Sequence, residues 1–297
     1  MKARAIVKRR KAVRNIRKIT KTMQMIATAK FQKALKRAKG TKPYAQKVHE
    51  LVDELAAAVG DIQHPLLRVV TEAERTKRIA LLVLTSNRGL AGAYNGHVLR
   101  TSNAFIHQQE AAGNAVELHL SGKKGITYFN FRKQKIEQRY DKFADMPRYV
   151  DVDAVAQQFM DRFVAGKLDA VYVAYMKFHS AGVQKPEVLT LLPLGGVGGD
   201  ADKAGKTARQ EMIYDFFPSA KELLDELLPQ TVKTTLFQCF LDATTSENVS
   251  RMVSMKSATD NADKMIKSLS MKYNRARQSQ ITTELSEIMG GVEAMKG

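Results

Sequence analysis

The longest stretch without glycine or proline lies between Pro229 and Gly290 and covers residues 230–289. Apolar residues recur in it at steps of three and four, at Met252, Met255, Ala258, Ala262, Met265, Leu269, Tyr273 and Ala276. This spacing is close to the coiled-coil period of about 3.5 residues and indicates a helix with a narrow apolar stripe. A helix over residues 219–289 would be roughly 105 Å long at about 1.5 Å per residue, so we expect it to project from any compact domain.

The expected bounds of this helix come from its flanking residues. Ser219 can cap the first turn, with Glu222 at the third helical position. Pro229 lies near the start of the helix, so we expect it to bend the helix locally without ending it. Ile281, Leu285 and Ile288 continue the helical spacing, and Gly290-Gly291 marks the expected end.

The first 60 residues predict a second long helix. Apolar residues again recur at steps of three and four, at Val13, Ile16, Ile19, Met23 and Ile26, and later at Ala45, Val48, Val52, Leu55 and Val59. We expect a kink or short break at Pro43 and an end at Gly60 and His64-Pro65. Two such helices would pack on each other, antiparallel if both leave the same body. The alternative is two separate helices lying on that body.

Positive charge is concentrated in this first helix. The chain has 48 Lys+Arg against 30 Asp+Glu, and residues 1–42 hold 16 of the basic residues and no acidic one. The remaining 32 basic residues nearly balance the 30 acidic residues. Residues 1–42 therefore form a basic arm. Such an arm requires an anionic partner, which could be nucleic acid, anionic lipid or an acidic protein surface.

Three interpretations of the arm remain open. A mitochondrial targeting peptide would be basic but usually rich in serine, whereas the first serine here is Ser86. A nucleic-acid-binding arm would be favoured by interleaved aromatic residues, but only Phe31 precedes Tyr44. The helical spacing favours the third interpretation, a helix with a basic face and an apolar stripe. There is no signal-peptide pattern at the start and no apolar run long enough to span a membrane.

The middle of the chain predicts a small α/β domain. Strands are expected at 79–85, 116–120, 170–178 and 188–192, and helices at 92–111 and 151–166. Residues 79–85 form a continuous apolar run, which is typical of a strand buried on both faces. Alternation of strands and helices indicates a mostly parallel sheet. We therefore expect three domains: a coiled-coil helix at 1–60, an α/β domain at 77–212 and a second coiled-coil helix at 218–297.

The sequence motifs that could indicate nucleotide binding, metal binding or catalysis are weak. Residues 199–207 resemble a phosphate-binding loop but have five residues between the glycines instead of four, and residues 196–201 imitate a dinucleotide fingerprint without a following helix. The six histidines show no metal-binding spacing, and Cys239 lies among apolar residues, as a buried structural thiol would. We expect no catalytic residue, no cofactor and no metal.

Four segments resemble the gamma subunits of F-type ATP synthases. They are residues 19–27 (ITKTMQMIA), 86–92 (SNRGLAG), 251–261 (RMVSMKSATDN) and 275–288 (RARQSQITTELSEI). The resemblance covers essentially the whole chain. Two positions differ from many members: Ala91 replaces a frequent cysteine, and Phe217 replaces a residue that is acidic in some relatives. The cysteine insertion of the redox-regulated chloroplast form is absent.

This resemblance implies a fold and a role. The fold is an antiparallel coiled coil of the N- and C-terminal helices with a small Rossmann-like, mostly parallel α/β domain. The role is that of the central rotor stalk, which couples ion-driven rotation of the membrane c-ring to ATP synthesis at a hexamer of alternating alpha and beta subunits, and the reverse. The implied partners are the alpha, beta and epsilon subunits and the c-ring, with no nucleic acid and only peripheral membrane contact, on the cytoplasmic side of a bacterial inner membrane.

The resemblance also implies site residues. Those expected to contact the beta subunit or to couple rotation are Met23, Lys21, Arg251, Arg277, Gln278, Thr282, Glu284 and Glu287. A basic face of the shaft, expected to meet acidic loops of the beta subunits, comprises Lys8, Arg9, Arg10, Lys18 and Lys30, together with Lys21; the alternative is that these charges only solvate the helix. The rotor base near the c-ring and the epsilon subunit would include Tyr214, Phe216 and Phe217. Rival functions are a nucleic-acid-binding protein with a basic arm and a dinucleotide-dependent enzyme.

Overall fold

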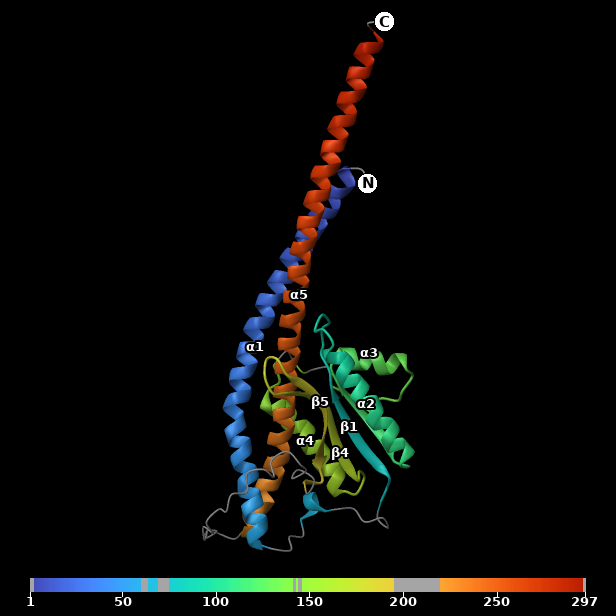
Figure 1. The fold of residues 1–297 in the computed structure, drawn as a ribbon. Coiled ribbons are helices and arrows are strands. Elements are labelled where there is room, and N and C mark those ends of the chain that lie inside the picture. Colours follow the sequence, from blue (N-terminus) through green and yellow to red (C-terminus); the bar gives the residue numbers. More distant parts are fainter. Residues whose placement is uncertain are drawn as a thin grey trace. The chain divides into compact units, whose positions relative to one another are not determined.

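The computed structural model describes residues 3–59, 64–68, 75–140, 143, 146–194 and 220–295. Along the chain, one long helix precedes and another follows a set of alternating strands and shorter helices (Figure 1). The elements are α1 (Ala3–Val59), a short 3-10 helix (Pro65–Leu67), β1 (Arg78–Leu84), α2 (Tyr94–Ala111), β2 (Ala115–Ser121), α3 (Lys123–Phe131), β3 (Gln138–Tyr140), α4 (Tyr149–Val164), β4 (Ala170–Phe178), β5 (Gln184–Leu192) and α5 (Ala220–Ala294).

The two long helices are confirmed, with two corrections. α1 passes through Pro43 without the expected break, because a proline removes only one backbone hydrogen bond from a helix that is held by packing over many turns. α5 does not end at Gly290-Gly291 but continues to Ala294, since a glycine costs a helix only about 1 kcal/mol and does not by itself stop it. The expected cap at Ser219 lies outside the described residues.

The sheet has five strands in the order β3-β2-β1-β4-β5. β1 pairs in parallel with β2 and with β4, β2 pairs in parallel with β3, and β4 pairs antiparallel with β5. The mostly parallel α/β prediction is therefore confirmed. The helix α3 and the strand β3 were not predicted from the sequence. β3 has only three residues, which is too short for an alternating pattern to be visible, and the nine residues of α3 give little more than two turns.

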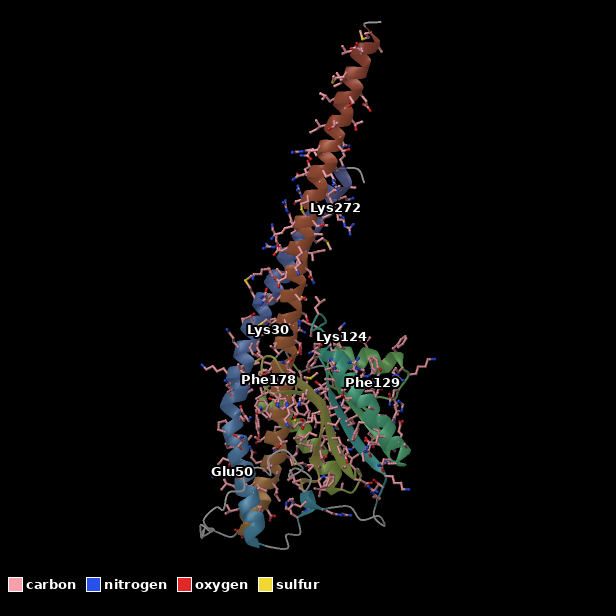
Figure 2. The ribbon with its side chains drawn as sticks, viewed as in Figure 1. Lys30, Glu50, Lys124, Phe129, Phe178 and Lys272 are labelled. Atoms are coloured by element: carbon pink, nitrogen blue, oxygen red, sulfur yellow. The ribbon has the colours of Figure 1, made fainter. Side chains whose placement is uncertain are left out.

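The strand β1 is buried on both faces, as its continuous apolar sequence predicts. Leu81 and Val83 pack with α2 and α3, in a cluster that includes Val98, Ile106 and Phe129. Figure 2 labels Phe129, a fully buried side chain of this layer. The α2 and α3 helices therefore cover one face of the sheet.

The other face of the sheet packs against α4 and the first part of α5. Ala80, Leu82 and Leu84 of β1 lie in this cluster. Phe159 of α4 and Leu236 of α5 are fully buried in it. This part of α5 is thus a core element of the α/β layers, held also by a hydrogen bond from Ser246 Oγ to the Met176 carbonyl, 3.1 Å long.

The described chain divides into two compact units. One comprises residues 1–29 with 251–297, and the other comprises residues 30–250. The first contains the paired ends of α1 and α5, and the second contains the sheet with its helices. The three-domain division expected from the sequence stays a prediction.

A buried histidine makes the stability of the second unit depend on pH. His119 of β2 is 1% exposed, lies edge-on to the Phe159 ring with centroids 4.9 Å apart, and its Nε2 atom has no hydrogen-bond partner in the described structure. Burial, reinforced by the charge of Arg162, lowers the pKa of His119 from 6.5 to about 4. The ring is therefore neutral in the folded protein at pH 5 but protonated in the unfolded chain.

We predict that acid destabilises the second unit through His119. Because the folded-state pKa is depressed, the contribution is fully present above pH 6.5 and is lost as the pH falls toward 4; between pH 7.5 and pH 5 the loss amounts to about 2 kcal/mol. His119→Phe, which keeps a ring of similar size, should remove this part of the pH dependence. Urea unfolding followed by tyrosine near-ultraviolet circular dichroism at both pH values measures it. An equal pH dependence in the variant would contradict the assignment.

Candidate functional site on the paired helices

The ends of α1 and α5 pack along a seam with a seven-residue repeat. In α1 the buried positions Ile6, Val13, Thr20 and Ala27 are each seven residues apart. In α5 buried and half-buried positions alternate steps of four and three, at Met255, Thr259, Ala262, Ile266, Leu269, Tyr273 and Ala276. This spacing keeps one stripe of each helix facing its partner, as in a coiled coil.

Polar contacts fix the register of this seam. Thr259 Oγ1 lies 2.9 Å from Thr20 Oγ1, and both residues are buried. The Arg10 guanidinium lies over the Tyr273 ring, 5.1 Å from its centroid. The lower-numbered α1 residue meets the higher-numbered α5 residue, so the helices run antiparallel, as Figure 1 shows. Each hydroxyl also lies within hydrogen-bond distance of a carbonyl of its own helix, Arg17 at 3.1 Å and Met255 at 2.8 Å, so the pair favours one register through the single contact across the seam that sliding would break.

The sequence-predicted stripe of α1 is partly wrong. Ile16, Ile19 and Ile26 do not face α5 but are exposed by 53%, 59% and 51%. Met265 of α5 is also exposed, and Ile266 takes its place in the seam. The prediction was wrong because Thr20 and Ala27 are less apolar than the isoleucines. The signal that could have located the seam was the seven-residue spacing of Thr20 and Ala27 from Val13. The isoleucines form a second apolar stripe on the outer face of α1, among basic side chains.

The last part of α5 extends as a single helix beyond the start of α1. Every residue from 281 to 295 is exposed, and apolar side chains recur there at Ile281, Leu285, Ile288, Val292 and Met295. The residues 281–294 correspond to roughly 20 Å of helix at about 1.5 Å per residue. Within the described part of this unit, nothing covers that stripe. An apolar face left open on a helix that is otherwise polar indicates a surface that meets another molecule.

The predicted coupling residues of α5 lie at or within this single-helix segment. Arg277, Gln278, Thr282, Glu284 and Glu287 are all exposed. The Thr282 Oγ1 atom donates to the Gln278 carbonyl over 3.0 Å, and the Gln280 Nε2 atom donates to Glu284 Oε1 over 2.8 Å. The structure therefore places these side chains together on one rigid, accessible element. Their contacts with a beta subunit stay predictions.

The remaining predicted residues of α5 and α1 differ in exposure. Arg251 is buried, whereas Met23 is half-buried and Lys21 is exposed. Of the predicted basic face, Lys8, Arg9 and Lys18 are exposed, Arg10 is partly covered by its contact with Tyr273, and Lys30 is half-buried in the other unit. Figure 2 shows nitrogen-tipped side chains along both helices, with Lys30 and Lys272 labelled.

This unit carries a strongly positive surface. Residues 3–29 contain nine basic and no acidic residues. One of them, Arg17, forms an ion pair with Asp263 across the seam, and both side chains remain close to half exposed. Such an exposed pair contributes only about 0–1 kcal/mol. Apart from Arg10 over Tyr273, most of the other charges of residues 3–29 are exposed and can interact with the surroundings.

Several predicted features fall outside the described residues. These are the rotor-base residues Tyr214, Phe216 and Phe217 and both glycine-rich motifs of residues 196–207. Among the residues that the structure describes, no cluster of histidine, cysteine, aspartate and glutamate has the arrangement of a metal site. None of the described helices is long and apolar enough to cross a membrane.

The sheet crevice that binds nucleotides in many α/β proteins is filled here. At the carboxyl end of β1, the cavity lined by Thr85, Ser121, Phe143 and Phe240 has a volume of only about 40 Å³. A pocket for an organic ligand usually measures about 300–1,000 Å³. This space holds water at most, so the geometry gives no support to a dinucleotide site at this place.

The segment after β1 has a structural role in this crevice. Backbone amides at the start of α3 are satisfied by it: Lys123 N donates to Asn87 Oδ1 over 3.2 Å, and Gly125 N donates to Thr85 Oγ1 over 2.9 Å. A Cβ atom on Gly122, whose φ is +97°, would lie 2.1 Å from the Thr85 carbonyl oxygen. The positive end of α3 is therefore capped by the chain itself, where a phosphate could otherwise bind.

We predict that Val13 and Ile16 contribute very differently to the pairing of the helices. Val13 is 7% exposed in the seam, so Val13→Ala should destabilise the local pairing by about 1–3 kcal/mol. Tryptic cleavage of the basic segment 3–29 in the full chain should then accelerate at least about fivefold, because cleavage needs local opening. Ile16→Ala is the matched control and should not accelerate cleavage. Equal effects of the two variants would contradict the assigned seam.

Known proteins share the sequence and the fold of this chain. The profile of the ATP synthase family matches residues 2–295. The ATP synthase gamma chain of Rhodopirellula baltica is 46% identical over 296 residues, which cover 99% of each chain. Among solved structures, a chain of the Euglena gracilis mitochondrial ATP synthase OSCP/F1/c-ring assembly has the same fold, with a TM-score of 0.64 at 18% identity, covering 99% of this chain and 94% of that one. A chain of the Euglena gracilis rotor gives a TM-score of 0.62 at 16% identity, covering 94% and 98%.

The match along nearly the whole length agrees with the seam, the single-helix end of α5 and the five-stranded sheet described above. The chain belongs to the family of ATP synthase gamma chains.

Proposed function

We propose that this chain is the central rotor stalk of an F-type ATP synthase. In this role it couples ion-driven rotation of the c-ring to ATP synthesis at the hexamer of alpha and beta subunits, and the reverse. The solved chains that share its fold come from an assembly described as F1 and c-ring and from one described as a rotor. The alternative of a nucleic-acid-binding protein has no support beyond the charge of the N-terminal segment.

The observation that carries the proposal is the two-helix pairing of residues 3–29 with the C-terminal part of α5. Two antiparallel helices have no threefold symmetry. On the axis of a ring with three catalytic sites, such a coil presents a different surface to each site. The three sites then differ in nucleotide affinity, and turning the coil exchanges their states. Because this coupling is a shared free energy, hydrolysis at the sites would turn the coil in the opposite direction.

The surfaces of the coil fit a partner that it must both push and slide past. Exposed basic residues such as Lys8, Arg9 and Lys18 would meet acidic loops of the beta subunits. Contacts between exposed charges contribute only about 0–1 kcal/mol each, so no single contact would hold the coil in one position. The uncovered apolar stripe beginning at Ile281 would lie in the axial channel of the hexamer, where it needs no polar partner.

The proposal assigns no chemical step to this chain. Catalysis would belong to the beta subunits, and the gamma chain would act only by position. Its place would be the cytoplasmic side of a bacterial inner membrane, held peripherally through the epsilon subunit and the c-ring. The residues of the rotor base that would make those contacts, Tyr214, Phe216 and Phe217, lie outside the described structure, so their role rests on the family resemblance alone.

Reconstitution tests the proposed function. Alpha and beta subunits of the same organism should copurify with this chain, and adding it should restore cooperative ATP hydrolysis that the two subunits lack without it. DNA should not compete for the chain at physiological salt concentration. A chain that binds DNA with a steep salt dependence and fails to join the hexamer would contradict the proposal and favour the nucleic-acid alternative.

We predict that Arg277→Ala lowers coupled ATP synthesis several-fold without unfolding the chain. Arg277 is exposed on α5 between the seam and the single-helix segment, and its guanidinium can hold a carboxylate of the beta subunit with two hydrogen bonds. Arg275→Ala is the matched control, since Arg275 is also exposed but belongs to another face of the helix. Synthesis driven by an ion gradient in membrane vesicles is the measurement. Unchanged synthesis in Arg277→Ala, or an equal loss in Arg275→Ala, would remove Arg277 from the coupling residues.

A further inference from the structure

A second cavity lies within the α/β unit, away from the filled crevice at β1. It has a volume of about 500 Å³ and lies among α1, the ends of β4 and β5, and α5. This volume falls in the range of about 300–1,000 Å³ that is usual for pockets that bind small organic molecules. Phe178, labelled in Figure 2, marks the β4 end of the cavity. Nothing in the proposed rotor function uses this cavity.

The inner wall of the cavity is apolar. Leu35, Ala38 and Ala45 of α1 contribute to it, opposite Tyr175 and Leu189 of the sheet. Ala38, Ala45 and Tyr175 are all less than 9% exposed. The small side chains of the two alanines leave the space open, where larger residues would have filled it. The body of a bound molecule would therefore be hydrocarbon or aromatic.

Among the charged residues of the wall, lysines outnumber carboxylates. Lys39 and Lys42 of α1 and Lys177 of β4 line the cavity, and Asp242 is the single carboxylate among its described lining residues. Asp242 is already engaged: Gln238 Nε2 donates to its Oδ1 over 2.9 Å, and the charges of Lys42 and Lys177 face it. Lys177 also pairs with Glu187 over 3.1 Å. Positive charge thus exceeds negative charge at the wall, which favours an anionic group on the ligand.

We infer that this cavity binds an amphipathic organic anion, with its apolar body against Ala38 and Ala45 and its acidic group at Lys39 and Lys42. Two sources share this chemistry, a fatty acid and an aromatic acid. Either would tie residues 35–46 of α1 to the sheet. By mass action, its binding would stabilise the unit that contains both elements.

Calorimetric titration of the full chain tests the inference. Dodecanoate, below its micellar concentration, represents the aliphatic source, and anilinonaphthalene sulfonate represents the aromatic source. We expect at least one of them to bind with one site per chain, and dodecanol, which lacks the charge, to bind more weakly. The anion that binds identifies the source.

Variants locate the site. Ala45→Phe should abolish binding by filling the cavity, and Lys42→Gln should weaken it by about fivefold, the equivalent of about 1 kcal/mol for a partly exposed charge contact. Lys36→Gln makes the same charge change at an exposed position of α1 outside the cavity and should alter affinity less than twofold. Because Lys42→Gln does not depend on packing, it remains informative if Ala45→Phe disturbs the fold.

Two results would overturn the inference. The first is the absence of saturable binding of both anions up to millimolar concentration. The second is binding that neither Lys42→Gln nor folded Ala45→Phe changes, which would place the probes on the exposed apolar stripes of α1 and α5. Neither result bears on the reconstitution of ATP hydrolysis, so the inferred ligand site and the proposed rotor function are tested independently.

Discussion

The seven-residue spacing of small and β-branched residues in α1 is the constraint on which the paired helices depend. Ile6, Val13, Thr20 and Ala27 keep one stripe of α1 turned toward α5 over three seven-residue repeats. Because that stripe is narrow, most of the circumference of each helix stays outside the seam. The basic side chains and the exposed isoleucines occupy this remainder, so the same spacing that pairs the helices also creates the surfaces offered to partner subunits.

Within its described residues, the α/β unit holds a packed five-stranded sheet and no cluster of metal ligands. Its sheet has the strand order of a doubly wound fold, but α5 and the segment after β1 occupy the crevice where such folds often bind nucleotides. Thr85, Asn87 and Gly122 close the start of α3 with backbone hydrogen bonds and a tight turn. Asn87 of the segment 86–92, which resembles its counterpart in the family, therefore has a structural role.

Much of this architecture could be predicted from the sequence, and the failures have physical causes. The long helices were visible because their apolar spacing persists over many turns, and β1 was visible because burial on both faces makes its sequence continuously apolar. The face of α1 was assigned wrongly because hydrophobicity favoured Ile16 and Ile19 over Thr20. The Thr20 hydroxyl can be buried because it donates to the Arg17 carbonyl and accepts from Thr259 across the seam. A buried threonine is not marked by hydrophobicity, so only its seven-residue spacing from Val13 could have located the seam. The coupling residues came from family resemblance, since Arg277 and Glu287 are exposed and apolar periodicity identifies only buried positions.

The central claim is that the chain turns as one element inside a threefold ring. It is tested most directly by fixing the alpha–beta hexamer to a surface, attaching a bead to an exposed residue of the α/β unit such as Lys124, and adding ATP (Figure 2). The account predicts unidirectional rotation of the bead in steps of one third of a turn, one for each catalytic site. Continuous hydrolysis of ATP by the complex while the bead stays at a fixed angle would contradict it.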